Sequence, residues 1–369
     1  MAALPGSRRR GLVMTTVPTR LEELSPAWLT DALQSAFPGI KVSRAEVADL
    51  TTGSAARVRL RLESDGNGSA PATVMVKAAF TDDLGEDDLS RAWIPLMALM
   101  HETESTWYTE RSAFLGDRVP ACWFAAVDGH EAVILLEDLD LRQAITYGSF
   151  DRPLGRDQMA SVLDVLASLH AKQWADPALT SSPLRDSFDA GGMLDGFLSK
   201  ANWDQQVVRP RFDRMPEELQ DFDICVSAIR EAWALKRQGP QSLIHGDPHV
   251  GNHFFDASGA GLLDWQLQTS GHWASDVVYA VASSMEIDDR RTNEQDLLRH
   301  YLERVNGLTD GKAPTFESAW NDYRRFAVWG VAAILTPGEG IQSEDYLTVV
   351  SERHARAAVD LESVSLLKA

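Results

Sequence analysis

Histidine, aspartate and asparagine side chains are concentrated in one glycine-rich segment, Leu243–Gln266, which reads LIHGDPHVGNHFFDASGAGLLDWQ. Its histidines His245, His249 and His253 recur at a spacing of four, which would align them on one face of a helix as zinc ligands. Pro248 and the intervening glycines argue against that helix, since proline removes a backbone donor and glycine lowers helix stability by about 1 kcal/mol. We therefore favour an extended loop between two short apolar runs, SLI and HFF, over a zinc-binding helix.

Two carboxylates and an amide of this segment have the character of a magnesium site. A turn, ASGAG, and a further strand, LLDWQ, follow the loop, and this order of elements can place Asp247, Asn252 and Asp264 around one point. Mg²⁺ prefers oxygen ligands and usually binds through one or two carboxylates plus substrate phosphates. The segment therefore indicates phosphoryl transfer. The plainer alternatives are a surface carboxylate for Asp247 and turn capping for the other two.

The spacing of these residues matches that of a known catalytic loop. In protein kinases the motif H-R-D-x-x-x-x-N separates its Asp from its Asn by five residues, and a metal-binding Asp follows. Asp247 and Asn252 have the same five-residue separation, and Asp264 lies twelve residues further on.

The string H-G-D-x-H-x-x-N at residues 245–252 resembles the aminoglycoside phosphotransferase and choline-kinase-like superfamily, which has a protein-kinase-like fold. The sequence D-W-Q at residues 264–266 is similar to the D-[FW]-Q variant of the ecdysteroid-kinase-like branch, to which the chain is most similar. ILLEDL at residues 134–139 looks like the hinge of that family, and SLHAKQW at residues 168–174 looks like one of its helices. The resemblance covers roughly residues 50–282.

The resemblance implies roles for the loop residues. Asp247 would be the catalytic base that accepts the proton of the substrate hydroxyl, and Asn252 and Asp264 would hold Mg²⁺. Three further residues would support the loop without reacting themselves: His245, His249 and Asp276. His170, on the apolar face of a helix, is expected to be a hydrogen-bonded core histidine.

A lysine and a glutamate are expected to hold the nucleotide phosphates. Lys77 ends the run VMVK, which is similar to the kinase strand whose lysine pairs with the phosphates and with a helix glutamate. A lysine on a half-buried strand needs such a partner, and Glu104 in ETESTWY fits the family pattern better than Glu102 or Glu110. The alternative for Glu104 is an exposed charge on a helix face.

The rest of the nucleotide site is implied by backbone groups. Gly53 and Ser54 belong to TTGSAARV, which would cover the phosphates although it has one glycine where protein kinases carry three. The hinge residues Glu137, Asp138 and Leu139 would offer backbone groups to adenine, with a purely structural linker as the alternative.

The elements that must position these residues follow from apolar spacing. RVRLRL at 57–62 and ATVMVKAAF at 72–80 alternate as strands, and Asp128-Gly129 joins two more, CWFAAV and EAVILLE, as a hairpin. Helical spacing occurs at 21–37, where Ser25 is a candidate N-cap followed by Pro26, and at 89–115. The later helical stretches are 156–174, 217–236, 276–285, 294–305, 316–335 and 343–361.

We therefore predict an α+β, two-lobed, protein-kinase-like fold. Residues 1–16 are expected to be a disordered lead, with Met14 as an alternative start. Residues 17–139 are expected to form an N-terminal nucleotide-binding lobe with an antiparallel sheet and one main helix. Residues 140–369 are expected to form a larger, mostly helical lobe with the catalytic loop and the acceptor site.

Composition limits the partners of the protein. Of its 369 residues 44% are apolar and 24% are charged, which is typical of a globular protein, and no apolar run is long enough to span a membrane. The 35 basic and 54 acidic residues give a net charge of −19, which disfavours nucleic acid and anionic lipid as partners. With two cysteines and no apolar run typical of a secretory signal, we expect a cytoplasmic protein, monomeric or homodimeric.

The function expected from these observations is that of a small-molecule kinase that uses ATP, or alternatively GTP, with Mg²⁺. It would phosphorylate a hydroxyl of a small acceptor that is aminoglycoside-, choline- or steroid/alcohol-like. The acidic composition favours a cationic acceptor, whereas the D-W-Q variant favours the steroid- or alcohol-like branch. The alternative is a non-catalytic, pseudokinase-like protein that binds a nucleotide.

Overall fold

The computed structural model describes residues 16–51, 55–65, 70–80, 88–188, 193–337 and 342–368, with side chains from residue 96 onward in the helix that begins at Asp88. These residues form two compact units. The first contains the described residues up to His101 together with Cys122–Asp138, and the second contains Glu102–Ala121 and the chain from Leu139 onward. Residues 102–121, which we assigned to the N-terminal lobe, thus group with the second unit.

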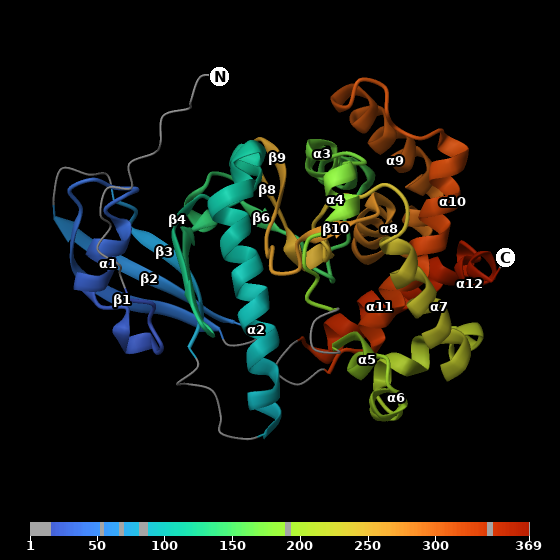
Figure 1. Ribbon diagram of the computed structural model, residues 1–369, viewed down its shortest axis with the longest axis horizontal. Coiled ribbons are helices and arrows are strands. Elements are labelled where there is room, and N and C mark those ends of the chain that lie inside the picture. The colour runs from blue at the N-terminus through green and yellow to red at the C-terminus, as the bar shows by residue number, and fades with distance from the viewer. Residues whose placement is uncertain are drawn as a thin grey trace. The chain divides into compact units, whose positions relative to one another are not determined.

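A five-stranded antiparallel sheet forms the body of the first unit (Figure 1). Its order is β1-β2-β3-β5-β4, and the strands are β1 Lys41–Thr51, β2 Ala56–Asp65, β3 Thr73–Ala79, β4 Cys122–Asp128 and β5 Glu131–Glu137. The predictions of β2 to β5 and of the hairpin turn are confirmed. We did not predict β1, because this edge strand is mostly exposed and lacks the alternation that marks a half-buried strand.

The core of the first unit lies between this sheet and helix α1, Pro26–Leu33. Val58 and Leu60 of β2 are buried, as their alternation predicts. Ser25 caps the helix by accepting a hydrogen bond from the Trp28 amide, and Pro26 occupies the first turn, so both predicted start signals are confirmed. The helix is shorter than the predicted stretch, since residues 21–23 form only a 3₁₀ turn and Leu33 is the last helical residue.

Helix α2, Asp88–Thr106, continues from the first unit into the second. It is followed by the π-helical turn η3, Trp107–Arg111, and by the 3₁₀ segment η4, Ser112–Arg118. The predicted stretch 89–115 is therefore helical almost throughout, but its winding changes after Thr106. Such π-bulges are frequent near functional sites.

The second unit is mostly helical (Figure 1). Its helices are α3 Arg156–Lys172, α4 Pro177–Ser181, α5 Met193–Phe197, α6 Lys200–Gln206, α7 Phe222–Lys236, α8 Trp273–Ser284, α9 Ile287–Leu308, α10 Phe316–Phe326, α11 Glu344–Asp360 and α12 Ser363–Leu367. Its 3₁₀ segments, besides η4, are η5 Leu139–Leu141, η7 Pro210–Arg214, η8 Glu217–Leu219, η9 Val250–Asn252 and η10 Ala327–Leu335. An aromatic-rich core that includes Trp203, Trp233 and Trp329 joins α6, α7, η10 and α11.

Two small sheets carry the segment with the predicted chemistry. Strand β7, Ser242–Ile244, pairs antiparallel with β10, Thr269–Gly271, and the other sheet has the order β6-β8-β9, from Thr146–Tyr147, His253–Asp256 and Gly259–Leu262. The predicted strands SLI and HFF are confirmed. The prediction of a strand over LLDWQ is wrong beyond Leu262, because Asp264 has a left-handed backbone (φ 60°) that an extended strand cannot contain.

The architecture confirms the predicted α+β class, with an N-terminal antiparallel sheet and a helical C-terminal part. Within the described ranges, the helices are all too short or too polar to cross a membrane.

Candidate active site

The loop between β7 and β8 depends on a glycine at its second residue. Gly246 has φ +88°, which side-chain-bearing residues rarely adopt, and a Cβ atom there would lie 2.2 Å from the backbone oxygen of Leu267. Only glycine fits this position. The glycine of H-G-D therefore sets the backbone conformation directly before Asp247.

Asp276 of α8 holds the same loop through hydrogen bonds to its backbone. Its carboxylate accepts hydrogen bonds from the backbone amides of His245 (2.6 Å) and Gly246 (3.0 Å) and contacts Nε2 of His170 at 3.2 Å. Burial raises the pKa of Asp276, but its hydrogen bond and ion pair with His170 and the contacts with His245 outweigh burial, so the net pKa is lowered. An ionised, buried carboxylate thus holds two consecutive loop amides.

The two ring nitrogens of His245 join the loop to the segment before Asp264. Nε2 lies 2.9 Å from the backbone oxygen of Leu263, and Nδ1 accepts a hydrogen bond from the Asp247 amide at 3.3 Å. Burial lowers the pKa of His245, so the ring is neutral, with its proton on Nε2 and an acceptor at Nδ1.

Asn252 connects the two predicted acidic residues. Its side-chain amide nitrogen donates to the backbone oxygen of Asp247 at 2.9 Å, and its backbone oxygen accepts from the amide of Leu263, the neighbour of Asp264, at 2.8 Å. The structure therefore brings Asp247, Asn252 and Asp264 into one hydrogen-bonded pair of loops. The left-handed backbone of Asp264 is a strained conformation of the kind that clusters at functional sites.

The donor set of Asn252 and Asp264 fits magnesium. The side-chain nitrogen of Asn252 donates to the backbone oxygen of Asp247, so the side-chain oxygen is the atom that can bind a metal. Asp264 contributes a carboxylate. Among the described residues, no three His, Cys, Asp or Glu side chains lie close enough together to hold a metal. A cation at this pair would therefore complete its shell with phosphate oxygens and water, as Mg²⁺ usually does.

The three histidines of the segment do not form a zinc site. Nδ1 of His249 accepts from the Gly251 amide at 3.0 Å, and Nε2 of His253 lies 3.1 Å from the backbone oxygen of Pro248. Together with the His245 contacts, these bonds show that the histidines hold the backbone of the loop. The zinc-binding alternative is wrong, because η9 covers only three residues and the loop contains no longer helix.

Two tyrosines that sequence reasoning missed lie next to Asp247. Tyr279 (α8) and Tyr346 (α11) are both close enough to Asp247 for its charge to influence their hydroxyl groups. Burial, and then the Asp247 charge, raises the pKa of both phenols well above the usual value, so both stay protonated. A protonated Tyr279 hydroxyl is able to donate a hydrogen bond to the Asp247 carboxylate. Nε2 of His249 lies 3.7 Å from Oδ2 of Asp247.

A histidine on α11 supports Tyr279. The rings of Tyr279 and His354 lie 4.6 Å apart, and His354 in turn fills the space where Gly330 of η10 has no side chain, since a Cβ there would lie 2.0 Å from Nδ1 of His354. Neither tyrosine has a motif around it. The sequence therefore contains no local signal that links either of them to Asp247.

Glu104 contacts the residue that follows Asp264. Its Oε1 accepts from the Trp265 amide at 3.3 Å, and Trp265 stacks on Trp107 with ring centroids 3.9 Å apart. Glu104 is 1% exposed, so the alternative of an exposed helix charge is wrong. Lys77 is a buried residue of β3 in the first unit, opposite Ile134 of β5. The pairing of Lys77 with Glu104 stays a prediction.

The hinge residues have different surroundings. The Asp138 carboxylate is buried in the first unit, where it accepts from Thr73 Oγ1 (2.6 Å) and Arg59 Nη2 (3.2 Å). Glu137 ends β5, and Leu139 begins η5 in the second unit. Their contacts with adenine stay predictions. Gly53 and Ser54 lie outside the described residues.

Comparison with known proteins matches residues 56–310 to the model of the ecdysteroid kinase-like family. No curated protein matches the sequence. Similar solved structures include a choline kinase from Cryptosporidium parvum (10% identity, 93% of this chain and 98% of that chain, TM-score 0.49) and a type VIII aminoglycoside-3'-phosphotransferase (17%, 83% and 97%, 0.44). A third is an aminoglycoside phosphotransferase from Streptomyces rimosus in complex with ADP and streptomycin (12%, 68% and 88%, 0.40).

Proposed function

Because the chain belongs to the ecdysteroid kinase-like family, we propose that it is a phosphotransferase that moves the γ-phosphate of ATP to a hydroxyl group of a small acceptor. The observation that carries this proposal is the hydrogen-bonded pair of loops that presents Asp247 beside the oxygen ligands Asn252 and Asp264. An aspartate beside a magnesium site is the arrangement that phosphoryl transfer to an alcohol requires.

Asp247 acts as the proton acceptor in the proposed reaction. The acceptor hydroxyl oxygen forms a bond to the γ-phosphorus, the bond from that phosphorus to the bridging oxygen breaks, and ADP leaves with the electron pair. The hydroxyl proton passes to the Asp247 carboxylate. In the proposal the Tyr279 hydroxyl donates a hydrogen bond to that carboxylate, so that α8 helps to orient the base.

Asn252 and Asp264 hold Mg²⁺ in the proposal, through one amide oxygen and one carboxylate. When bound, the cation neutralises the charge of the phosphates. Lys77 and Glu104 are proposed to position the phosphates, and the backbone of Glu137–Leu139 is proposed to contact adenine. GTP is the alternative nucleotide. We further propose that the protein is cytoplasmic and acts as a monomer or homodimer on a small acceptor, with no nucleic-acid or membrane partner, in keeping with its net charge of −19.

Thermal unfolding with and without Mg-ATP and Mg-GTP tests the proposal, with EDTA as a control for the metal. A nucleotide at one hundred times its dissociation constant stabilises the fold by about 2.7 kcal/mol, which is a measurable shift. We expect a metal-dependent shift that is lost in Asp264→Ala and kept in Asp213→Ala, an exposed aspartate of η7. No shift with either nucleotide would overturn the proposal.

Turnover separates the kinase from a non-catalytic nucleotide-binding protein. ADP release should rise when a suitable alcohol is added, and Asp247→Ala should abolish this rise while the Mg-ATP shift stays, because the variant loses a transition-state contact and not a ground-state one. Binding of Mg-ATP without turnover of any alcohol would favour the pseudokinase alternative.

A further inference from the structure

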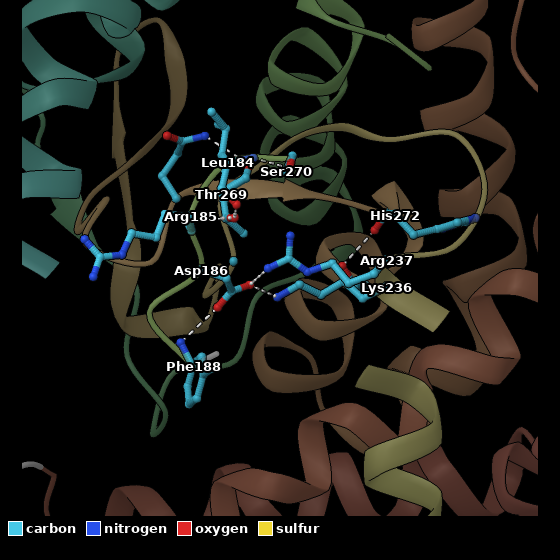
Figure 2. A network of polar contacts seen from close by, with 12 residues as sticks. Leu184, Arg185, Asp186, Phe188, Lys236, Arg237, Thr269, Ser270 and His272 are labelled. Atoms are coloured by element: carbon cyan, nitrogen blue, oxygen red, sulfur yellow. Dashed lines mark hydrogen bonds and ion pairs between the residues drawn. The ribbon is translucent and has the colours of Figure 1, made fainter. Parts of the chain in front are cut away.

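One buried network of the second unit has its cations neutralised by the protein itself (Figure 2). Oδ2 of Asp186 lies 2.8 Å from Nζ of Lys236 and 3.1 Å from Nη2 of Arg237. The Asp186 and Lys236 side chains are only 3% and 5% exposed. A buried cation that is paired in this way holds the fold together and is closed to a ligand. A ligand for the cations of this unit therefore needs a hollow that solvent reaches.

Such a hollow, of about 230 Å³, lies where α3 packs against η4, β9 and α9. It is smaller than the pockets of roughly 300–1,000 Å³ that hold drug-sized ligands, so it suits a small molecule or one charged group of a larger one. Asp247, Asn252 and Asp264 are not among the described residues that line it. The hollow is therefore separate from the candidate active site.

Two arginines of the lining have guanidinium nitrogens that the protein does not use. Nη1 of Arg118 donates to the backbone oxygen of Ala260 at 3.2 Å, and its Nε lies 3.7 Å from Oδ1 of the exposed Asp117. Nε of Arg304 lies 2.9 Å from Oδ1 of Asp164. Among the described residues, Nη2 of Arg118 and both Nη atoms of Arg304 have no hydrogen-bond acceptor. These nitrogens are donors for an anion in the hollow.

The one carboxylate among the described lining residues is that of Asp164. Its Oδ1 lies 2.9 Å from Nε of Arg304 and 2.9 Å from Nε2 of His300, so its charge is compensated by its neighbours. A hydroxyl group adds to the donors. Oγ of Ser161 accepts from the Ala260 amide at 2.9 Å, which leaves its own proton for another acceptor.

The charge of the hollow differs from that of the chain as a whole, which is −19. Two arginines and one aspartate line it, and a further cation is close by, since Nζ of Lys172 lies 5.2 Å from the ring centroid of the lining residue Phe114. Leu115 and Val165 give the lining a buried, apolar part, beside which a hydrogen bond to a charged group is stronger than in water. A small anion is therefore the ligand that suits this hollow.

A glycine lets the backbone approach these donors. Gly259 begins β9 with φ +114°, a conformation that residues with a side chain rarely adopt. A Cβ atom there would lie 2.9 Å from Oγ of Ser161 and 3.4 Å from Nη1 of Arg118. The turn between β8 and β9 thus comes close to both donors because this residue has no side chain.

We propose that the hollow is a binding site for a phosphate group, either that of a small phosphate monoester or free phosphate. Phosphate oxygens accept paired hydrogen bonds from the planar guanidinium group, so arginine suits phosphate better than a point charge does. Arg118 of η4 and Arg304 of α9 supply such groups from two segments far apart in the chain, and the Ser161 hydroxyl adds a donor from α3. The inference does not depend on the proposed function, because it uses none of the residues of the candidate active site.

Calorimetric titrations with inorganic phosphate and with glycerol 3-phosphate test the site, at constant ionic strength with EDTA and without nucleotide. We expect the wild type to bind with a dissociation constant of about 1 mM or below. Arg118→Met and Arg304→Met should each bind about tenfold or more weakly, since each variant loses a hydrogen bond between charged groups. Arg299→Met is the matched control and should bind like the wild type. Arg299 also lies on α9, also pairs with an aspartate, and is 46% exposed, compared with 51% for Arg304.

Asp264→Ala separates the hollow from the candidate active site and should also bind phosphate like the wild type. The inference is overturned if the wild type binds neither probe, if both arginine variants bind like the wild type, or if binding is lost in Asp264→Ala or Arg299→Met. Circular dichroism checks folding, and the half-exposed Arg304 keeps the test valid if Arg118→Met unfolds. Tighter binding of glycerol 3-phosphate would identify an ester as the ligand, and equal or weaker binding would identify free phosphate. Both of these outcomes support the phosphate site.

Discussion

The carboxylate of Asp276 accepts a 2.6 Å hydrogen bond from the backbone amide of His245, and this contact fixes the loop between β7 and β8 to α8. Because Asp276 accepts a second bond from the Gly246 amide, both of its oxygens face donors. The loop thus takes its shape from a charged group in the core, and the proposed base at Asp247 inherits its position from that group.

Asp276→Asn should destabilise the protein by about 2–3 kcal/mol, since one amide of the loop then faces an NH₂ group in place of an oxygen. ADP release should fall as well, because Asp247 loses its fixed position. Urea unfolding at pH 7 measures the first effect. Asp213→Asn, an exposed change, is the control, and equal stability of both variants would contradict the role of Asp276.

Gly246→Ala should lower the free energy of unfolding by more than backbone strain alone would. The left-handed backbone costs about 1–2 kcal/mol for a residue with a Cβ, and the clash with the Leu267 oxygen adds to it. Gly239→Ala is a matched control in the same unit, because Gly239 has φ +70° but no atom within 4 Å of the position that an alanine methyl group would take. Unfolding free energies should therefore rank wild type, Gly239→Ala and Gly246→Ala in falling order. The reverse order of the two variants would refute the close approach.

Tyr279→Phe should lower kcat for ADP release about tenfold, since the proposed hydrogen bond from its hydroxyl to the charged Asp247 is worth roughly 1.5–3 kcal/mol. The ring stays in place against His354, so the KM for ATP should stay within about a factor of two of the wild-type value. Tyr323→Phe removes another buried hydroxyl, near Glu294, and should change stability without changing kcat. An unchanged kcat in Tyr279→Phe would show that the hydroxyl does not position the base.

Acid should destabilise the fold through buried histidines. Burial, and then neighbouring positive charge, lowers the pKa of His253 and His354 to about 3 and that of His272 to about 4. Below pH 6.5 these histidines bind protons in the unfolded chain but stay neutral in the folded chain. The free energy of unfolding therefore falls as the pH decreases from 6.5 toward these pKa values. Each such histidine contributes about 1.4 kcal/mol per pH unit to this slope.

His354→Leu isolates one of these contributions. Between pH 6 and 4 the slope of the unfolding free energy should be lower than in the wild type by about 1.4 kcal/mol per pH unit. Unfolding by urea at several pH values measures both slopes. His130→Leu, which changes an exposed histidine of the β4–β5 turn, is the control and should leave the slope unchanged.

Local signals in the sequence were sufficient for most of the fold. Alternation predicted β2 and β3, and the Ser25-Pro26 pair predicted the start of α1, because these patterns depend only on neighbouring residues. The edge strand β1 buries too few side chains to leave a pattern. His170, expected in the core, is buried and contacts Tyr301 and Asp276 through its two ring nitrogens.

The candidate site was predictable where it is one segment and not where it is assembled from several. The H-G-D motif and its spacing pointed to Asp247, Asn252 and Asp264, which the fold does bring together. Tyr279 and Tyr346 approach the same carboxylate from α8 and α11, and no local rule links residues so far apart in the chain. The strand predicted over LLDWQ failed because the Trp265 amide bonds to Glu104 in place of a neighbouring strand.

Because α11 contributes to the surroundings of Asp247, the candidate site is complete only late in translation. A ribosome makes the loop between β7 and β8 before α8, α9 and α10, and only afterwards adds Tyr346 and His354 of α11. A nascent chain that already contains the whole H-G-D motif therefore still lacks α11 next to its proposed base. The proposed kinase activity is therefore expected in a nascent chain only after α11 has left the ribosome, well after the H-G-D motif has been made.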